Sequence, residues 1–175
     1  MLTLNGQKMA KSTGNNILPA EILSGDTNKL TKGFSASVVR FFMMQAHYRS
    51  ILDFSNDALL ASEKGFMKLM EAVSTLDKLE ATSGANEFDV SAWKANCYTA
   101  MNDDFNTPIL IAELFSAVKY INQIKAGKAT IGNSNLVLLR QVIHQFVFDI
   151  LGLKNDNSNT QDQKLGDTVD LLIRM

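Results

Sequence analysis

Apolar residues recur at spacings of three, four and seven over most of the chain beyond residue 35, which is the pattern of amphipathic helices. Short polar connections separate these periodic stretches, and short connections between amphipathic helices favour an antiparallel bundle. We therefore expect a mainly α fold. The predicted helices span residues 35–48, 56–79, 90–101, 108–127 and 134–151.

Residues with known capping preferences stand at the ends of these helices. Ser55 is placed to cap the longest helix and Thr107 the helix after it but one, because a side-chain hydroxyl can accept from the unpaired N–H groups of a first turn. Pro108 suits the first position of that helix, since proline has no backbone N–H group. Gly127 and Gly152 are expected to end the last two helices, since glycine adopts the left-handed conformation of a helix C-terminus.

The N-terminal segment lacks this helical period. Residues 2–8 alternate apolar and polar positions around Asn5-Gly6, a strong hairpin signal, although the further partners of so short a ribbon must lie elsewhere. Residues 9–18 have no period and are expected to form a loop. Pro19 is suited to the first turn of a short helix over residues 19–24.

Two polar stretches interrupt or follow the predicted bundle. Residues 81–89 are rich in turn formers and are expected to connect two helices. Residues 154–164 contain no apolar side chain and are expected to be disordered. The last eleven residues begin a helix that the sequence cuts short, so we expect the natural chain to continue.

Composition allows a folded domain and places its positive charge at one end. Of the 175 residues 46% are apolar, which is enough to fill a core. The net charge is −1, yet the first 50 residues carry six Lys or Arg against two acids, which leaves −5 for the rest. An anionic partner should therefore meet the N-terminal third.

Cysteine and histidine usage gives little support for a metal or redox site. The single cysteine, Cys97, lies among apolar residues at helical spacing, so a buried hydrophobic role is favoured over a reactive thiol. His47 and His144 are far apart, and no cysteine cluster accompanies them. No apolar run reaches the roughly 18 residues of a membrane span, and no signal-peptide pattern opens the chain. We expect a cytoplasmic protein with no membrane partner.

Residues 8–12, Lys-Met-Ala-Lys-Ser, closely resemble the KMSKS signature of class I aminoacyl-tRNA synthetases. Two further segments follow the order and spacing of the cysteinyl-tRNA synthetase family, namely residues 38–59, which contain AHYRS and LDFS, and residues 101–108, MNDDFNTP. The resemblance covers most of residues 1–153.

The resemblance implies an ATP-dependent reaction. Such an enzyme activates cysteine with ATP, as its magnesium complex, to cysteinyl-adenylate and then esterifies the amino acid to tRNA(Cys). Lys11 matches the signature lysine that contacts ATP, Lys8 the first lysine, and Ser12 the closing serine; Met9 also matches. A mobile ammonium that closes on the phosphates stabilises the transition state. The alternative, that both lysines are only solvated loop residues, remains open from the sequence alone.

One signature position departs from the family pattern. Ala10 stands where the signature has serine, which removes at most one hydrogen bond, a contribution of about 1 kcal/mol. Because both lysines remain, we expect the substitution to adjust the loop without abolishing its role.

The resemblance also implies elements that this sequence does not contain. We expect the chain to be a C-terminal part of the enzyme that lacks the HIGH-containing nucleotide-binding half, with zinc held only in that missing catalytic domain. The isolated chain is then expected to be inactive, and its parent to be monomeric. Without those neighbours residues 1–30 would have little to pack against, so we expect them to be poorly ordered or held by a second copy, with residues 35–152 firm.

The remaining matched segments resemble the stem-contact region and tRNA-side bundle of the family. We therefore expect residues 1–52 to form the KMSKS-type loop and stem-contact segment, residues 53–153 the bundle, and residues 154–175 a linker with the start of the next helical segment. Phosphate contacts require cationic side chains. The candidates for tRNA contact are Lys29, Lys32, Arg40 and Arg49.

Each of these assignments has a structural alternative. The four cations could be ordinary surface residues, with Arg49 paired to Asp53. His47 and Tyr48 could stack on RNA, but packing against the following helix is favoured. Residues 102–108, with two adjacent acids, are interpreted as a turn rather than a metal site.

Two other functions stay open at this stage. One is a related ligase that forms cysteinyl-adenylate and joins cysteine to an amino-sugar. The other is a helical module that binds RNA or protein and has no enzymatic parent.

Overall fold

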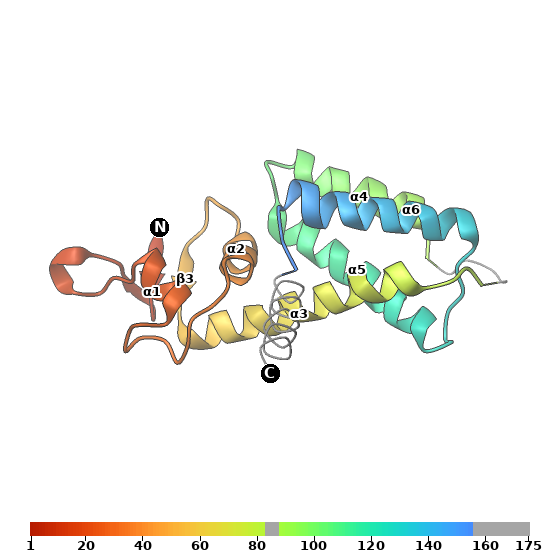
Figure 1. The fold of residues 1–175 in the computed structure, drawn as a ribbon. Helices are drawn as coiled ribbons and strands as arrows, with labels where there is room; N and C mark the ends of the chain where they lie inside the picture. Colours follow the sequence, from red (N-terminus) through yellow and green to blue (C-terminus); the bar gives the residue numbers. More distant parts are fainter. Residues whose placement is uncertain (83–87, 156–175) are drawn as a thin grey trace, which may run out of the picture.

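The computed structural model describes residues 1–82 and 88–155. Its long helix α3, Asn56–Lys78, joins a small N-terminal module at one end to a helical bundle at the other (Figure 1). The mainly α fold predicted from the sequence is confirmed. The other elements are β1 Leu2–Leu4, β2 Gln7–Lys8, η1 Lys11–Thr13, α1 Pro19–Ser24, α2 Ala36–Met44, β3 Leu52–Phe54, α4 Val90–Asn102, α5 Thr107–Lys125, α6 Asn133–His144 and η2 Gln145–Ile150.

A three-stranded sheet of order β2-β1-β3 organises the N-terminal module. The predicted hairpin is confirmed: β1 and β2 are antiparallel, and Asn5 and Gly6 turn the chain with φ values of 52° and 77°. The missing partner of this ribbon is β3, which runs parallel to β1 with Leu4 opposite Phe54. The expected division of the chain after residue 52 falls inside β3, and it stays a prediction.

Residues 1–30 have packing partners within their own chain, so the expectation that they have little to pack against is wrong. The side chains of Leu4, Ile17, Ile22 and Leu30 are all buried. They join the same core as Phe54 of β3, because the β1–β3 pairing brings this distant strand against the N-terminus. Sequence periodicity could not show this pairing, since three-residue strands are too short to carry a clear pattern.

Helix α2 connects the module to the bundle through aromatic packing. It lies against α3, and the fully buried Phe41 ring is 5.9 Å from Phe66 of α3 and 6.5 Å from Phe115 of α5, measured between centroids. The apolar core therefore runs without a break from the sheet into the bundle.

The bundle forms where α3, α4, α5 and α6 pack on one another. Ser55 caps α3 as predicted, and its hydroxyl accepts from the Ala58 amide at 3.2 Å. The predicted cap of α5 is displaced by one residue, because Asn106 is the N-cap and Thr107 already lies in the helix. The Thr107 hydroxyl instead donates to the Met44 carbonyl at 2.8 Å, which ties α5 to the end of α2.

The last helix ends as expected but changes its winding on the way. Residues Asn133–His144 are α-helical, residues Gln145–Ile150 continue as a π-helix, and Gly152 turns the chain with a φ of 62°. The Lys154 amide then donates to the hydroxyl of Ser37 on α2 at 3.2 Å. The predicted disorder after residue 155 and part of the 81–89 connector lie outside the described residues.

Candidate functional site

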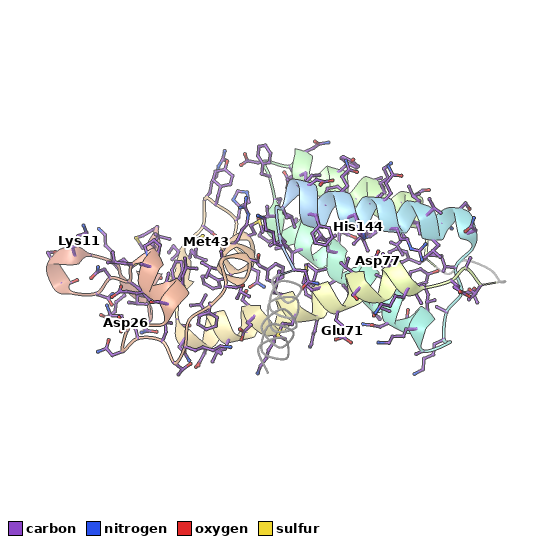
Figure 2. The ribbon with its side chains drawn as sticks, viewed as in Figure 1. Lys11, Asp26, Met43, Glu71, Asp77 and His144 are labelled. Carbon is purple, nitrogen blue, oxygen red and sulfur yellow. The ribbon has the colours of Figure 1, made fainter. Side chains whose placement is uncertain are left out.

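The signature loop, residues 8–16, projects from the N-terminal module away from the bundle (Figure 1). It leaves the sheet at Lys8, turns through the single 3₁₀ turn η1, and returns past Gly14, whose φ is 69°. The Ala10 amide donates to the Asn15 carbonyl at 3.0 Å and closes the loop. Figure 2 shows Lys11 at the far end of this projection.

The functional groups of the loop face water. Lys8, Lys11 and Ser12 are all exposed. Among the described residues, neither lysine has a carboxylate within salt-bridge distance. Two exposed ammonium groups that no described carboxylate neutralises form a site suited to an anionic ligand.

Side chains tie the base of the loop. The Asn15 side-chain amide donates to the carbonyls of Gln7 and Lys8 at 3.1 and 3.2 Å. From outside the loop, the Lys29 ammonium donates to the Gly14 carbonyl at 3.3 Å and to the Asn16 carbonyl. The two strands of the loop are therefore fixed where they meet the module. Lys8 lies at this tied base, in β2, whereas Lys11 and Ser12 lie beyond it in η1.

The departure at Ala10 leaves the closed turn intact. The Ala10 carbonyl accepts from the Thr13 hydroxyl at 3.0 Å and from the Thr13 amide at 3.3 Å. These bonds start η1 without a side chain from residue 10, consistent with the modest effect expected for the missing hydroxyl.

The four tRNA-contact candidates do not form one free cationic patch. Lys29 is engaged with the loop carbonyls, and Lys32 pairs with Glu63 of α3 at 2.6 Å. The Arg40 guanidinium lies beside Gly152, near the end of the described chain. A Cβ atom at position 152 would be 3.4 Å from the guanidinium carbon. Arg49 pairs with Asp104 at 3.0 Å, so the alternative pairing with Asp53 is wrong.

The Arg49 pair belongs to a polar contact between the α2–β3 connection and the turn before α5. The Tyr48 hydroxyl donates to Asp104 at 2.7 Å and also accepts from Arg49 Nε at 3.0 Å. The pKa of Arg49 is raised by the hydrogen bond to Tyr48 and by the charge of Asp104. His47 stacks on Tyr48 with ring centroids 4.7 Å apart.

Asp104 has a left-handed backbone with a φ of 54°, and its partners could not be predicted from residue spacing. Its neighbours behave as turn formers, because the Asn106 side-chain amide donates to Asp103 at 3.0 Å. The structural interpretation of the 102–108 segment is thus consistent with the geometry. The segment additionally joins the bundle to the α2–β3 connection through Asp104. This role could not be predicted from the sequence, because the residues in contact are more than 50 positions apart.

Two further titratable groups have shifted pKa values. Asp53 accepts from the Thr3 hydroxyl at 2.5 Å and from the Gly6 amide at 2.8 Å, and these bonds lower the pKa of its carboxyl group. Cys97 is fully buried in α4, and desolvation raises the pKa of its thiol to about 12. That thiol is therefore a core group rather than a nucleophile.

The described residues also limit what else the site could hold. They contain no group of three or more His, Cys, Asp or Glu side chains placed to bind a metal, so zinc does not fit this part of the chain. In the same residues, no helix combines the length and apolar character that crossing a bilayer requires.

Comparison with known proteins gives two family matches. Residues 1–64 match the model of the class I (C) tRNA synthetase catalytic domain, and residues 96–165 match that of the DALR domain. The chain is 48% identical over 175 residues to the cysteine–tRNA ligase of Bacteroides fragilis and 47% identical to that of Parabacteroides distasonis. Each alignment covers 99% of this chain and 35% of the relative. The corresponding protein of Bacteroides thetaiotaomicron is 46% identical, with 99% and 36% covered. The chain thus spans about a third of the length of these curated relatives.

Proposed function

Because the chain belongs to the cysteine–tRNA ligase family of class I aminoacyl-tRNA synthetases, we propose that it forms the part of such an enzyme that contacts ATP phosphates and tRNA. The whole enzyme would join cysteine to ATP, release pyrophosphate, and then transfer the cysteinyl group from the adenylate to the 3′ end of tRNA(Cys). The signature loop would serve the first step and the helices the second.

The proposed role of the loop follows from its exposed cations. When the cysteine carboxylate attacks the α-phosphorus, the bond to pyrophosphate breaks and negative charge grows on the leaving oxygens. The ammonium of Lys11, supported by Lys8 and the Ser12 hydroxyl, would neutralise that charge more strongly in the transition state than in bound ATP. Magnesium is expected to arrive with ATP, since residues 8–16 include no carboxylate.

One observation carries this proposal: Lys11 projects on the exposed loop and Lys8 is exposed at its base, and no carboxylate of the described residues lies within salt-bridge distance of either ammonium. Asn15 and Lys29 fix the base of the loop. A loop fixed at its base and free at its tip can close over a ligand while keeping its internal geometry. We propose that Lys29, one of the candidates for tRNA contact, instead supports the loop through its hydrogen bonds to Gly14 and Asn16.

For tRNA we propose contacts from Lys32, Arg40 and Arg49. Each of these cations already lies near an acidic or backbone group of the protein. A tRNA phosphate would therefore have to displace Glu63 from Lys32 and Asp104 from Arg49, or bind the same cation beside that carboxylate. Such contacts would position the tRNA without reading its bases.

By itself the chain is proposed to be inactive, because it spans only about a third of the length of its relatives, and we propose that the groups that hold the adenosine and the cysteine lie in the remainder. Orientation of both reactants supplies much of the rate of a two-substrate reaction. Formation of cysteinyl-adenylate by residues 1–175 alone, measured as cysteine-dependent ATP–pyrophosphate exchange, would contradict this.

A chimeric enzyme tests the proposed function. This chain replaces the matched stretch of the Bacteroides fragilis ligase, and the product is assayed for ATP–pyrophosphate exchange and for charging of tRNA(Cys). We expect both activities, and no cysteine transfer to glucosaminyl-inositol. Transfer to the amino-sugar instead of tRNA would support the amino-sugar ligase. Loss of exchange in a folded chimera, with RNA binding by the isolated chain, would support the non-enzymatic module.

A further inference from the structure

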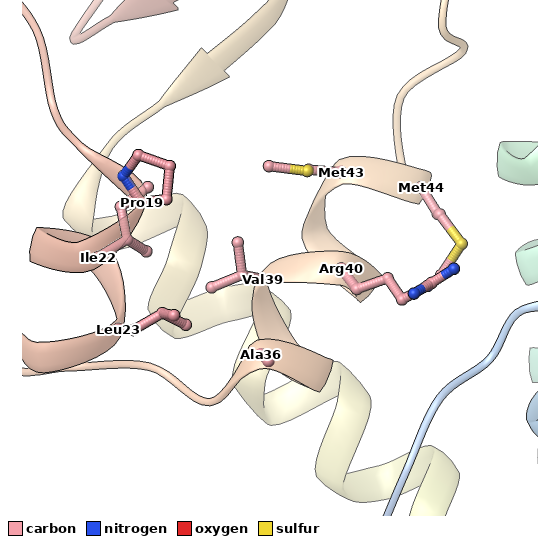
Figure 3. Close-up of a pocket in the computed structure, with 8 residues that line it drawn as sticks. All are labelled: Pro19, Ile22, Leu23, Ala36, Val39, Arg40, Met43 and Met44. Atoms are coloured by element: carbon pink, nitrogen blue, oxygen red, sulfur yellow. The ribbon is translucent and has the colours of Figure 1, made fainter.

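An apolar groove lies between α1 and α2, close to where the signature loop joins the module (Figure 3). Its volume is about 520 Å³ and it is open to solvent. In Figure 3 the side chains of Ile22 and Leu23 on α1 face that of Val39 on α2, while Arg40 and Met44 lie together at one end. The apolar lining comes from Pro19, Ile22 and Leu23 of α1 and Val39, Met43 and Met44 of α2.

The floor of this groove includes the buried Ile22 and Val39, but large apolar side chains at its edges are exposed. Leu23 and Met43 expose 48% and 46% of their surface, and Leu18, just before α1, exposes 48%. Burial of apolar surface is favourable by about 25 cal/mol per Å². A concave cluster of large exposed apolar residues therefore marks a surface that is covered by a binding partner.

Two observations indicate which partner. Every residue lining the groove falls within residues 1–64, the stretch that matches a class I catalytic-domain model. The chain also spans only 35% of the length of its Bacteroides fragilis relative, so that relative contains a large additional part. A surface within the catalytic-domain match is expected to contact the rest of that domain.

The groove also lies close to the signature loop along the chain. Helix α1 begins at Pro19, five residues after Gly14 of the signature loop, and the Phe34 amide donates to the Ile22 carbonyl at 3.0 Å. Lys29, between the two groove helices, is bonded to the loop carbonyls. A body bound in the groove is thus fixed relative to the loop, and the loop needs a nucleotide held at a defined place.

We propose that the α1–α2 groove binds an apolar ridge of the remaining part of a class I catalytic domain. The inference rests on the proposed function, because it takes the loop to act on a nucleotide that this other part holds. It assigns the groove to an interface between parts of one enzyme, rather than to a small ligand or a second copy of the chain.

Thiol labelling tests whether the groove is covered. Met43→Cys places a reactive thiol in the groove, and Met67→Cys places one on the exposed face of α3, where Met67 is 52% exposed. The native Cys97 is buried, with its pKa raised to about 12, so it stays unlabelled in folded protein and gauges the fold of each sample. Maleimide labelling, mapped by mass spectrometry, is followed in the isolated chain and in chimeras with the Bacteroides fragilis and Parabacteroides distasonis ligases.

We expect the Met43→Cys thiol to label about ten-fold or more slowly in the chimeras than in the isolated chain, since a buried thiol is shielded from the reagent. The Met67→Cys thiol should label at the same rate in both. Equal rates at Met43→Cys would overturn the inference. So would protection that already appears in the isolated chain and grows with its concentration, because that would show a second copy in the groove.

The labelling result is separable from the proposed function. Protection of Met43→Cys in a folded chimera that lacks ATP–pyrophosphate exchange would uphold the groove interface and reject the enzymatic role. Exchange without protection would uphold the role of the loop and reject the interface.

Discussion

The ammonium of Lys29 lies 3.3 Å from the carbonyl oxygen of Gly14, across the base of the signature loop. It donates to Asn16 as well, so one side chain holds two backbone carbonyls on the returning strand of the loop. Hydrogen bonds from a charged donor are stronger than those between neutral groups, at about 1.5–3 kcal/mol. Lys29 is therefore a positioning residue for the loop rather than a free cation.

Replacing Lys29 should loosen the loop. In Lys29→Met we expect faster amide hydrogen exchange over residues 8–16 and, in the chimeric enzyme, a fall of about ten-fold in kcat/KM for ATP, because the lysines lose their fixed base. Lys29→Arg should recover most of the activity, since it restores a charged donor. The matched control is Lys32→Met, which removes another lysine and breaks its pair with Glu63 and its contact with the Phe34 ring, neither of which involves the signature loop. Equal effects at both positions would assign the loss to charge alone.

Local signals in the sequence were sufficient for much of the helical architecture. The Ser55 cap, the Asn5-Gly6 hairpin and the glycine at residue 152 each act within a few residues, and each was predicted and is confirmed. Thr107 shows the limit of such signals. Threonine and asparagine are both good N-caps, and the contact that holds the Thr107 hydroxyl comes from Met44, more than 60 residues away.

The features missed in the sequence are those made by contacts between distant residues. β3 becomes a strand because β1 lies beside it, 50 residues earlier in the chain. The partners of Lys29 and Arg49 depend on how separate loops approach one another in the fold. The charge of a residue and its spacing along the sequence do not predict that approach. The motif indicated the loop itself, but the division between its free tip and its tied base required the structure.

The bonds to Asp53 should make the N-terminal sheet sensitive to acid. Its carboxylate accepts from Thr3 and Gly6, which lowers its pKa in the folded state. A lowered folded-state pKa stabilises the protein above the unfolded value, about 3.9 for aspartate, and that stabilisation is lost as the pH falls through the folded pKa. Asp53→Asn should therefore be less stable than the parent at pH 6, by an amount that shrinks below about pH 4. Urea unfolding at pH 6 and pH 3 measures this, and a constant difference would contradict it.

A buried serine offers a test of the core. Ser62 lies inside α3, and its hydroxyl has no hydrogen-bond partner among the described residues. Ser62→Ala removes an unpaired polar group and favours the helix, so we expect a gain of about 1 kcal/mol in the free energy of unfolding. The control is Ser116→Ala in α5, where the exposed hydroxyl already donates to Ala112 at 3.3 Å. Destabilisation by Ser62→Ala would show that its hydroxyl has a partner after all.

The central claim is that the exposed lysines of the signature loop act on the phosphates of ATP, and pyrophosphate exchange tests it most directly. In the chimeric enzyme, cysteine-dependent ATP–pyrophosphate exchange is measured for Lys11→Ala and for Lys68→Ala, which removes an exposed lysine from α3. We expect Lys11→Ala to lower kcat by about 10²-fold or more, the usual cost of losing one group that stabilises a transition-state charge. Lys68→Ala should match the parent. Exchange by Lys11→Ala at the rate of the parent would contradict the account.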